Sequence, residues 1–377
     1  MKPLIALLFF LFTIQSFTYS QEQHPKAELI QALKEQGDAA YLDKKYNDAL
    51  GYFKKIQSYY EEEPLVDSLF RIHIKGLADC FDALGRMEEM VLFLETWLAK
   101  QDEKKIESNR HYLFVKNLLG SYYVSKPKYK DKLSFLEKTK SVIQINFGEK
   151  HELYGRSVNL LGSYHTMHGA YAQAEVYLKE LLEIRKKGTK DYAIGLNNLA
   201  LNFLYKGEFE EAEPLFLEAL SILKKLEDTG DSYAQIVSNL AGVYWKLGRY
   251  EESGAMLEEV LAIYIQSYGE DHPLSLRTLN AVAAVSQKAG NPKKAKDTYE
   301  ALLKSYHRKG DSTSTNYIIV LNNLGTIYNK LKEYKSAVRC FEKSDELCKQ
   351  NYAVDHPEMV INHVNLAGVY KALERYN

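Results

Sequence analysis

Residues 193–216 read AIGLNNLALNFLYKGEFEEAEPLF, and this stretch decides the fold. Apolar residues recur at helical spacing on both sides of Gly207. Glycine is the residue that most often follows the last turn of a helix. The stretch therefore predicts two helices joined by a tight turn.

The same pattern recurs along the chain at spacings of 38 to 42 residues, which gives nine copies. The copies begin near Ile30, Arg71, Leu113, Gly155, Ala193, Ala234, Leu276, Ile318 and Val360. Self-similarity at a fixed period is typical of repeat proteins, in which each unit packs against its neighbours. The sequence therefore predicts an all-α array of stacked helix-turn-helix units.

Three positions of the repeat, counted from these starts, explain how its helices pack. Position 8 holds only glycine or alanine, and position 24 holds a large apolar residue, so two helices can approach closely. The small residues are Gly37, Ala78, Gly120, Gly162, Ala200, Ala241, Ala283, Gly325 and Ala367. The large ones are Phe53, Leu94, Leu136, Leu178, Phe216, Leu257, Tyr299 and Phe341. At position 15 the first helix is predicted to end at Gly85, Gly169, Gly207, Gly248 and Gly290.

The array is predicted to occupy residues 30–377, as about eight full repeats and a truncated ninth, after a lead-in of residues 21–29. The ninth copy ends at Asn377 with apolar residues that still follow the packing pattern. The outer face of a terminal repeat should instead be polar. We therefore expect this sequence to be part of a longer chain.

These residues resemble the tetratricopeptide repeat (TPR). The spacing near 42 residues and the connector Gly-Glu-Asp-His-Pro at 269–273 are similar to the longer, kinesin-light-chain variety of that repeat. The resemblance covers roughly residues 30–377 and implies a right-handed superhelical solenoid. It also extends to the repeat region of exported bacterial proteins in which a CHAT-type, caspase-like peptidase domain follows the repeats.

The first twenty residues predict a secretory signal peptide. Lys2 gives a short positive region, residues 4–14 are almost unbroken apolar sequence, and small residues precede a cleavage point before Gln21. An uncleaved anchor is the alternative, but this apolar run is shorter than the ~20 residues of a spanning helix. We therefore expect an exported protein, periplasmic or secreted, with no membrane span after cleavage.

Composition argues against several functional classes. The 49 basic and 50 acidic residues nearly cancel, and no basic stripe appears, so nucleic-acid binding is not expected. The three cysteines lie within predicted helices, and Cys340 and Cys348 are too far apart along one helix to form a disulfide. They are interpreted as packing residues together with Cys80.

Motifs for catalysis, cofactors and metals are missing from the sequence. The histidines closest to a metal-binding spacing are His165 and His168, which have no third ligand nearby. His272 and His356 precede proline in equivalent connectors, which favours a role in building the turn. No catalytic residue, no cofactor and no metal site is therefore predicted.

The resemblance implies that positions 2, 5, 6, 9, 12 and 13 of the first helices face a concave groove that holds a protein or peptide partner. Position 5 is asparagine in five copies and serine in a sixth. Asparagine is a mediocre helix former, but its amide can bind a peptide backbone. The candidate peptide-binding residues are Asn117, Asn159, Asn197, Ser238, Asn280, Asn322, Arg156, Arg277, Trp245, Lys246, Lys288 and Lys330.

A second interpretation of these residues stays open. The amides can instead bond to a neighbouring helix within the array, and this is favoured for position 6, where Asn198, Asn239, Asn323 and Asn365 lie. Each lysine can simply be solvated. If the groove interpretation holds, the scattered positive charge suits a peptide with some acidic character.

Two functional classes follow from the sequence. The first is a non-catalytic, exported scaffold that binds a protein or peptide partner. The second is the substrate-recruiting or regulatory N-terminal part of a longer enzyme, such as a CHAT-type peptidase. The partner and the oligomeric state are not encoded in any motif of the sequence.

Overall fold

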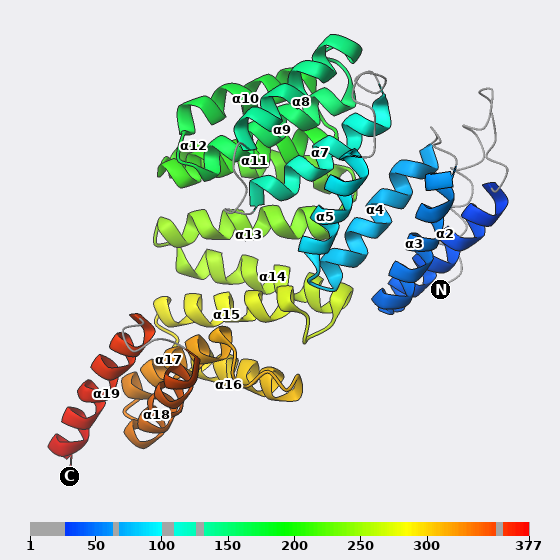
Figure 1. The fold of residues 1–377 in the computed structure, drawn as a ribbon. Helices are drawn as coiled ribbons and strands as arrows, with labels where there is room; N and C mark the ends of the chain where they lie inside the picture. The colour runs from blue at the N-terminus through cyan, green and yellow to red at the C-terminus, as the bar shows by residue number, and fades with distance from the viewer. Residues whose placement is uncertain (1–26, 63–67, 100–108, 126–131, 352–356, 377) are drawn as a thin grey trace. The chain divides into compact units, whose positions relative to one another are not determined.

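The computed structural model describes residues 27–62, 68–99, 109–125, 132–351 and 357–376. Within these ranges the chain forms seventeen helices and no strand (Figure 1). The predicted all-α fold is confirmed, because the helices pack in consecutive pairs along the chain. The predicted signal peptide and lead-in, up to residue 26, lie outside the described residues.

The chain divides into two compact units, residues 1–157 and 158–377, which are described separately. The helices of the first unit are α2 (Ala27–Leu42), α3 (Tyr46–Glu62), α4 (Ser68–Ala83), α5 (Met87–Ala99), α7 (Arg110–Ser125) and α8 (Lys132–Phe147). Helix α9 (Glu152–Met167) crosses the boundary between the units.

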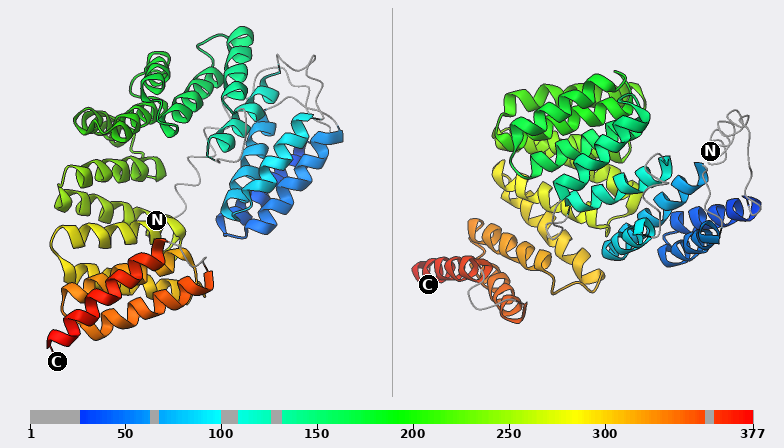
Figure 2. Two further views of the ribbon diagram at one scale, coloured as in Figure 1. Left: turned by 60° about the vertical axis from the view of Figure 1, so that its left-hand side comes forward. Right: turned by 45° about the horizontal axis from the view of Figure 1, so that its top comes forward.

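The second unit holds the later repeats of the array. Its helices are α10 (Tyr171–Ile184), α11 (Lys190–Lys206), α12 (Phe209–Lys225), α13 (Asp231–Lys246), α14 (Tyr250–Tyr268), α15 (Pro273–Lys288), α16 (Pro292–Arg308), α17 (Thr315–Lys330), α18 (Tyr334–Asn351) and α19 (Pro357–Tyr376). Figure 2 shows α13, α14 and α15 side by side, one after another. Below, the first helix of each pair is called the A helix and the second the B helix.

The predicted repeat starts coincide with the helices. Each of the nine lies on the fourth residue of an A helix: Ala234, for example, lies in α13, which begins at Asp231. The tightest pairings join α11 to α12, α13 to α14, and α17 to α18. The sequence period therefore corresponds to one helical pair.

Close approach of paired helices depends on the small residue at position 8. A Cβ on Gly162 would lie 2.7 Å from Leu178 Cγ, and a Cβ on Gly37 would lie 3.1 Å from Phe53 Cζ. The large residues at position 24 are buried in all eight copies that have one. The predicted contact between small and large residues is confirmed at these two glycines, where it joins the two helices of one repeat.

The turn between the two helices requires a left-handed backbone at position 15. The five predicted glycines all have positive φ, from 67° at Gly85 to 92° at Gly207. Lys44 and Lys332 occupy the same position in the first and eighth repeats, and both have a φ of 62°. L-residues adopt this conformation at a cost, so these two turns are strained relative to the others.

Two of the described connectors between repeats use a histidine as a helix cap. The His272 ring stacks on Tyr268 with centroids 4.5 Å apart, and its Nδ1 accepts a hydrogen bond from Leu274 N, 3.3 Å away. The interpretation of His272 as a turn-building residue is therefore confirmed. His151 makes the same contacts with Phe147 and Leu153, and this role of His151 was not predicted from the sequence. His356 lies outside the described residues.

Candidate protein-binding surface

The A helices of the second unit present one partly exposed face, which we call the A-face: positions 2, 5, 6, 9, 12 and 13 of α11, α13, α15 and α17. On α13 these positions run from Gln235 at position 2 to Lys246 at position 13. Both end residues are exposed, and those between them are half-buried. The A-face is therefore accessible at both ends of α13, and in all four helices position 13 is exposed.

Position 13 carries a lysine at the end of three successive A helices. Lys246, Lys288 and Lys330 are the last residues of α13, α15 and α17, and all three are exposed. None of them has an ion-pair partner in the part of the chain that the structure describes. A lysine is stabilised at a helix C-terminus by the macrodipole, and its charge stays available to a partner.

Tyr205 occupies position 13 of α11 and is 60% exposed. It is not among the candidate residues predicted from the sequence, which at position 13 are Lys246, Lys288 and Lys330. Reading position 13 down the repeats would have found it. An aromatic side chain beside the lysines adds an apolar contact to the charged end of the A-face.

The other predicted groove residues of α13 and α15 differ in accessibility. Trp245 is half-buried: its ring contacts the Tyr250 ring edge-on at 5.4 Å and packs against a cluster that contains Leu257 and Val282. Arg277 at position 2 of α15 is exposed. Trp245 is therefore mainly a packing residue, whereas the Arg277 side chain is exposed to solvent.

Four asparagines form a continuous hydrogen-bonded chain across three repeats. Asn239 Nδ2 donates to Asn197 Oδ1 at 2.8 Å, and Asn197 Nδ2 donates to Asn198 Oδ1 at 3.0 Å. Asn198 Nδ2 then donates to Asn159 Oδ1 at 2.7 Å. These amides, which we call the amide relay, connect α13, α11 and α9. The relay favours the structural interpretation for Asn159 and Asn197.

The remaining position-5 residues lie in several environments. Asn322 is buried, while Asn280 and Ser238 are half-buried, and Asn280 Oδ1 has no hydrogen-bond partner among the described atoms. The Asn280 amide therefore keeps one acceptor atom that the described chain does not use. Binding of a peptide by these residues stays a prediction.

Two predicted site residues belong to the first unit. Asn117 is buried; it donates to Leu113 O at 3.1 Å and accepts from Ser157 Oγ at 3.0 Å. Arg156 forms an ion pair with Glu152 at 2.7 Å and lies over the Phe114 ring. Both side chains therefore have partners within their own unit.

The described residues show no group of three or more histidine, cysteine or acidic side chains that could hold a metal ion. His168 stacks on Tyr164 at 4.1 Å, and His165 stacks on Tyr177 at 5.5 Å. Burial raises the pKa of the Cys80 and Cys340 thiols to about 11, and Cys348 is buried. Thiols with a raised pKa are poor nucleophiles at neutral pH, as expected for packing residues.

The sequence is similar to those of kinesin light chain-related proteins from a plant. The chain is 23% identical over 336 residues to KINESIN LIGHT CHAIN-RELATED 3 of Arabidopsis thaliana, covering 88% of this chain and 50% of that protein. It is 22% identical to KINESIN LIGHT CHAIN-RELATED 1 of the same plant, covering 75% of this chain and 47% of that protein. The chain thus spans about half the length of the curated relatives it matches.

A similar fold is found in a solved structure, the signal transduction ATPase PH0952 of Pyrococcus horikoshii, which has a tetratricopeptide-repeat sensor. Its TM-score is 0.65 at 16% identity, covering 97% of this chain and 52% of that one. At this identity the likeness concerns the fold alone. No described helix of the present chain has the length and apolar character needed to cross a membrane.

Sequence profiles of the tetratricopeptide repeat match residues 156–188, 194–229, 232–307 and 316–377. These matches begin close to the A helices α9, α11, α13 and α17. Together they span more than half of the sequence. The chain therefore belongs to the tetratricopeptide-repeat family.

Proposed function

We propose that this chain is a non-catalytic scaffold that binds an acidic segment of a partner protein on the A-face of its second unit. One observation carries the proposal: Lys246, Lys288 and Lys330 recur at the exposed ends of three A helices without an ion-pair partner in the described chain. Tetratricopeptide repeats are typical protein-binding modules, which supports this class of function.

The energetics favour a partner that contacts several repeats at once. A single exposed lysine–carboxylate pair contributes only ~0.2–1 kcal/mol. Three such pairs on one bound segment together contribute about 1.5 kcal/mol, which corresponds to roughly a tenfold change in affinity. The position-13 lysines therefore select and orient an acidic segment, while the exposed Tyr205 ring and the half-buried Trp245 ring offer apolar contact.

A selection from a library of random dodecapeptides displayed on phage tests this function. We expect the peptides that bind the chain to be enriched in aspartate and glutamate, and to lose affinity for the triple variant K246E/K288E/K330E. The matched control is K293E/K304E/K309E, which changes the net charge by the same amount. Its three lysines are exposed and lie in α16 or directly after it. Enrichment of neutral or basic peptides, or equal losses in both variants, would contradict the proposal.

We further propose that the chain is exported, on the basis of its first twenty residues. A positive start, an apolar run and small residues before Gln21 form the three parts of a signal peptide. Mass spectrometry of the mature protein should find Gln21 at its N-terminus. An intact Met1 on the protein in an envelope fraction would contradict cleavage.

A further inference from the structure

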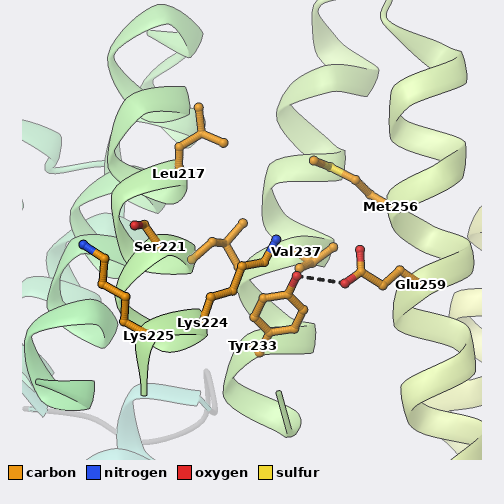
Figure 3. A pocket seen from close by; sticks show the side chains of 9 residues that line it. Leu217, Ser221, Lys224, Lys225, Tyr233, Val237, Met256 and Glu259 are labelled. Carbon is orange, nitrogen blue, oxygen red and sulfur yellow. Dashed lines mark hydrogen bonds between the residues drawn. The ribbon is translucent and has the colours of Figure 1, made fainter. Parts of the chain in front are cut away.

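A pocket of about 510 Å³ lies between two successive B helices of the second unit, and its base is formed by the A helix between them. It is lined by Leu217, Leu220, Ser221, Lys224 and Lys225 of α12, Tyr233 and Val237 of α13, and Met256 and Glu259 of α14. Figure 3 shows these side chains gathered around the gap between the three helices.

The pocket is separate from the A-face. Successive residues of an α-helix are ~100° apart, so Tyr233 and Val237 lie on one stripe of α13, about 40° from each other. Gln235 and Lys246 lie about 200° and 220° from Tyr233 by the same count. The pocket and the A-face are therefore on opposite sides of α13, and substitutions can address one without touching the other.

The pocket has an apolar base. Leu220 and Val237 are buried, whereas Leu217 at the rim is 45% exposed and Met256 is half-buried. An exposed leucine beside a recess of this size leaves apolar area in water that a ligand side chain can cover. The base therefore suits one large apolar side chain.

The rim carries more positive than negative charge. Lys224 and Lys225 are exposed, and neither has an ion-pair partner among the residues described. The Lys224 ammonium lies 5.7 Å from the Tyr233 ring centroid. On the opposite side, Glu259 Oε1 accepts a hydrogen bond from the Tyr233 hydroxyl at 2.8 Å. The lining thus includes two lysines and one carboxylate, so positive charge is in excess at the rim.

The combination of an apolar base and a positively charged rim is not needed to build the repeat. At the equivalent positions of the next junction, between α14 and α16, Glu258 replaces Leu217, Ile265 replaces Lys224, and Thr298 replaces Met256. Positions that maintain a repeat array recur from unit to unit, whereas binding positions vary. The chemistry of this pocket is therefore specific to the junction between α12 and α14.

From this geometry we infer that the pocket is a second binding site, which takes a peptide segment carrying a large apolar side chain next to a carboxylate. The apolar side chain covers Leu217 and contacts Val237 and Met256, and the adjacent carboxylate meets Lys224 and Lys225. A basic segment is disfavoured because these two ammonium groups repel it.

A selection with built-in depletion tests this site independently of the A-face. A random dodecapeptide phage library is selected on the wild-type chain after depletion on K224E/K225E, so that only pocket-dependent peptides remain. We expect these peptides to carry aspartate or glutamate beside leucine, phenylalanine or tryptophan. Their affinity should fall about tenfold or more in K224E/K225E.

Two further variants make the outcome decisive. Ser221→Trp fills the pocket without changing its charge and should abolish binding, while K246E/K288E/K330E should leave it unchanged. Circular dichroism melting confirms that each variant is folded. The inference is overturned if no peptide survives depletion, if the survivors lack an acidic residue, or if they lose affinity only in the A-face variant. The last result would support the proposed function and reject the pocket.

Discussion

The ring of Phe341 on α18 lies against the backbone of Gly325 on α17 so closely that a Cβ on this glycine would be 2.7 Å from Phe341 Cε1. Gly325 and Phe341 are the position-8 and position-24 residues of the eighth repeat, and both are buried. This contact is the feature of the repeat on which the pairing of the two helices depends.

Gly325→Ala should therefore destabilise the protein although alanine is the better helix former. Overpacking of a helix crossing costs ~1–3 kcal/mol, which exceeds the propensity gain of about 0.5–1 kcal/mol. Gly242 on α13 is the matched control, because a Cβ there meets nothing within 4 Å. Gly242→Ala should raise the melting temperature. A rise for both variants would contradict the packing account.

Lys332→Gly should stabilise the eighth repeat. Lys332 holds a φ of 62° at the turn position where five other repeats use glycine. Relief of left-handed strain worth ~1–2 kcal/mol outweighs the entropy that glycine adds to the unfolded chain, for a net gain of roughly 0.5–1 kcal/mol. Urea denaturation measures the gain. The reverse change, Gly248→Lys, should lower stability, and equal stabilities would argue against strain at this turn.

Breaking the amide relay should cost stability. Asn197→Ala removes the acceptor of Asn239 Nδ2 and the donor to Asn198 Oδ1. An unpaired polar group costs ~1–3 kcal/mol when buried, and these two half-buried groups lie at the lower end of that range. Asn280→Ala should be nearly neutral, since Asn280 Oδ1 has no partner to lose. Thermal melting of the two variants compares them directly. If Asn197→Ala instead left stability unchanged and weakened peptide binding, the ligand interpretation of this residue would be restored.

Acid should weaken the first unit through His73. This side chain is buried, and desolvation lowers its pKa from 6.5 to about 3. In the unfolded chain His73 binds a proton below about pH 6.5, whereas in the folded chain it does so only near pH 3. The folded state is therefore destabilised as pH falls through this window. The slope is at most about 1.4 kcal/mol per pH unit.

The pH effect is checked by comparing wild type with His73→Gln, which does not titrate. Urea midpoints between pH 7 and pH 5 should fall less steeply in the variant, because the other titrating groups are common to both proteins. Parallel curves would show that His73 is accessible to protons in the folded state.

The sequence predicted the packing of this fold better than its surfaces. The Gly or Ala at position 8 and the glycines of the turns have one physical role each, so their recurrence identified the helix pairs directly. Asparagine at position 5 has two roles open to it, and only the distances of Asn159, Asn197 and Asn239 to their neighbours distinguish them. The pocket at Lys224 was not predicted, because its chemistry does not recur and a search for periodic features passes over it.

The most direct test of the account is the dissociation constant of a selected acidic peptide, measured by fluorescence anisotropy against two variants of equal net charge. The account predicts that K246A/K288A/K330A weakens binding about tenfold, with a smaller dependence on salt, whereas K293A/K304A/K309A binds as wild type does. Equal dissociation constants for wild type and K246A/K288A/K330A would contradict the claim that the A-face is the binding surface.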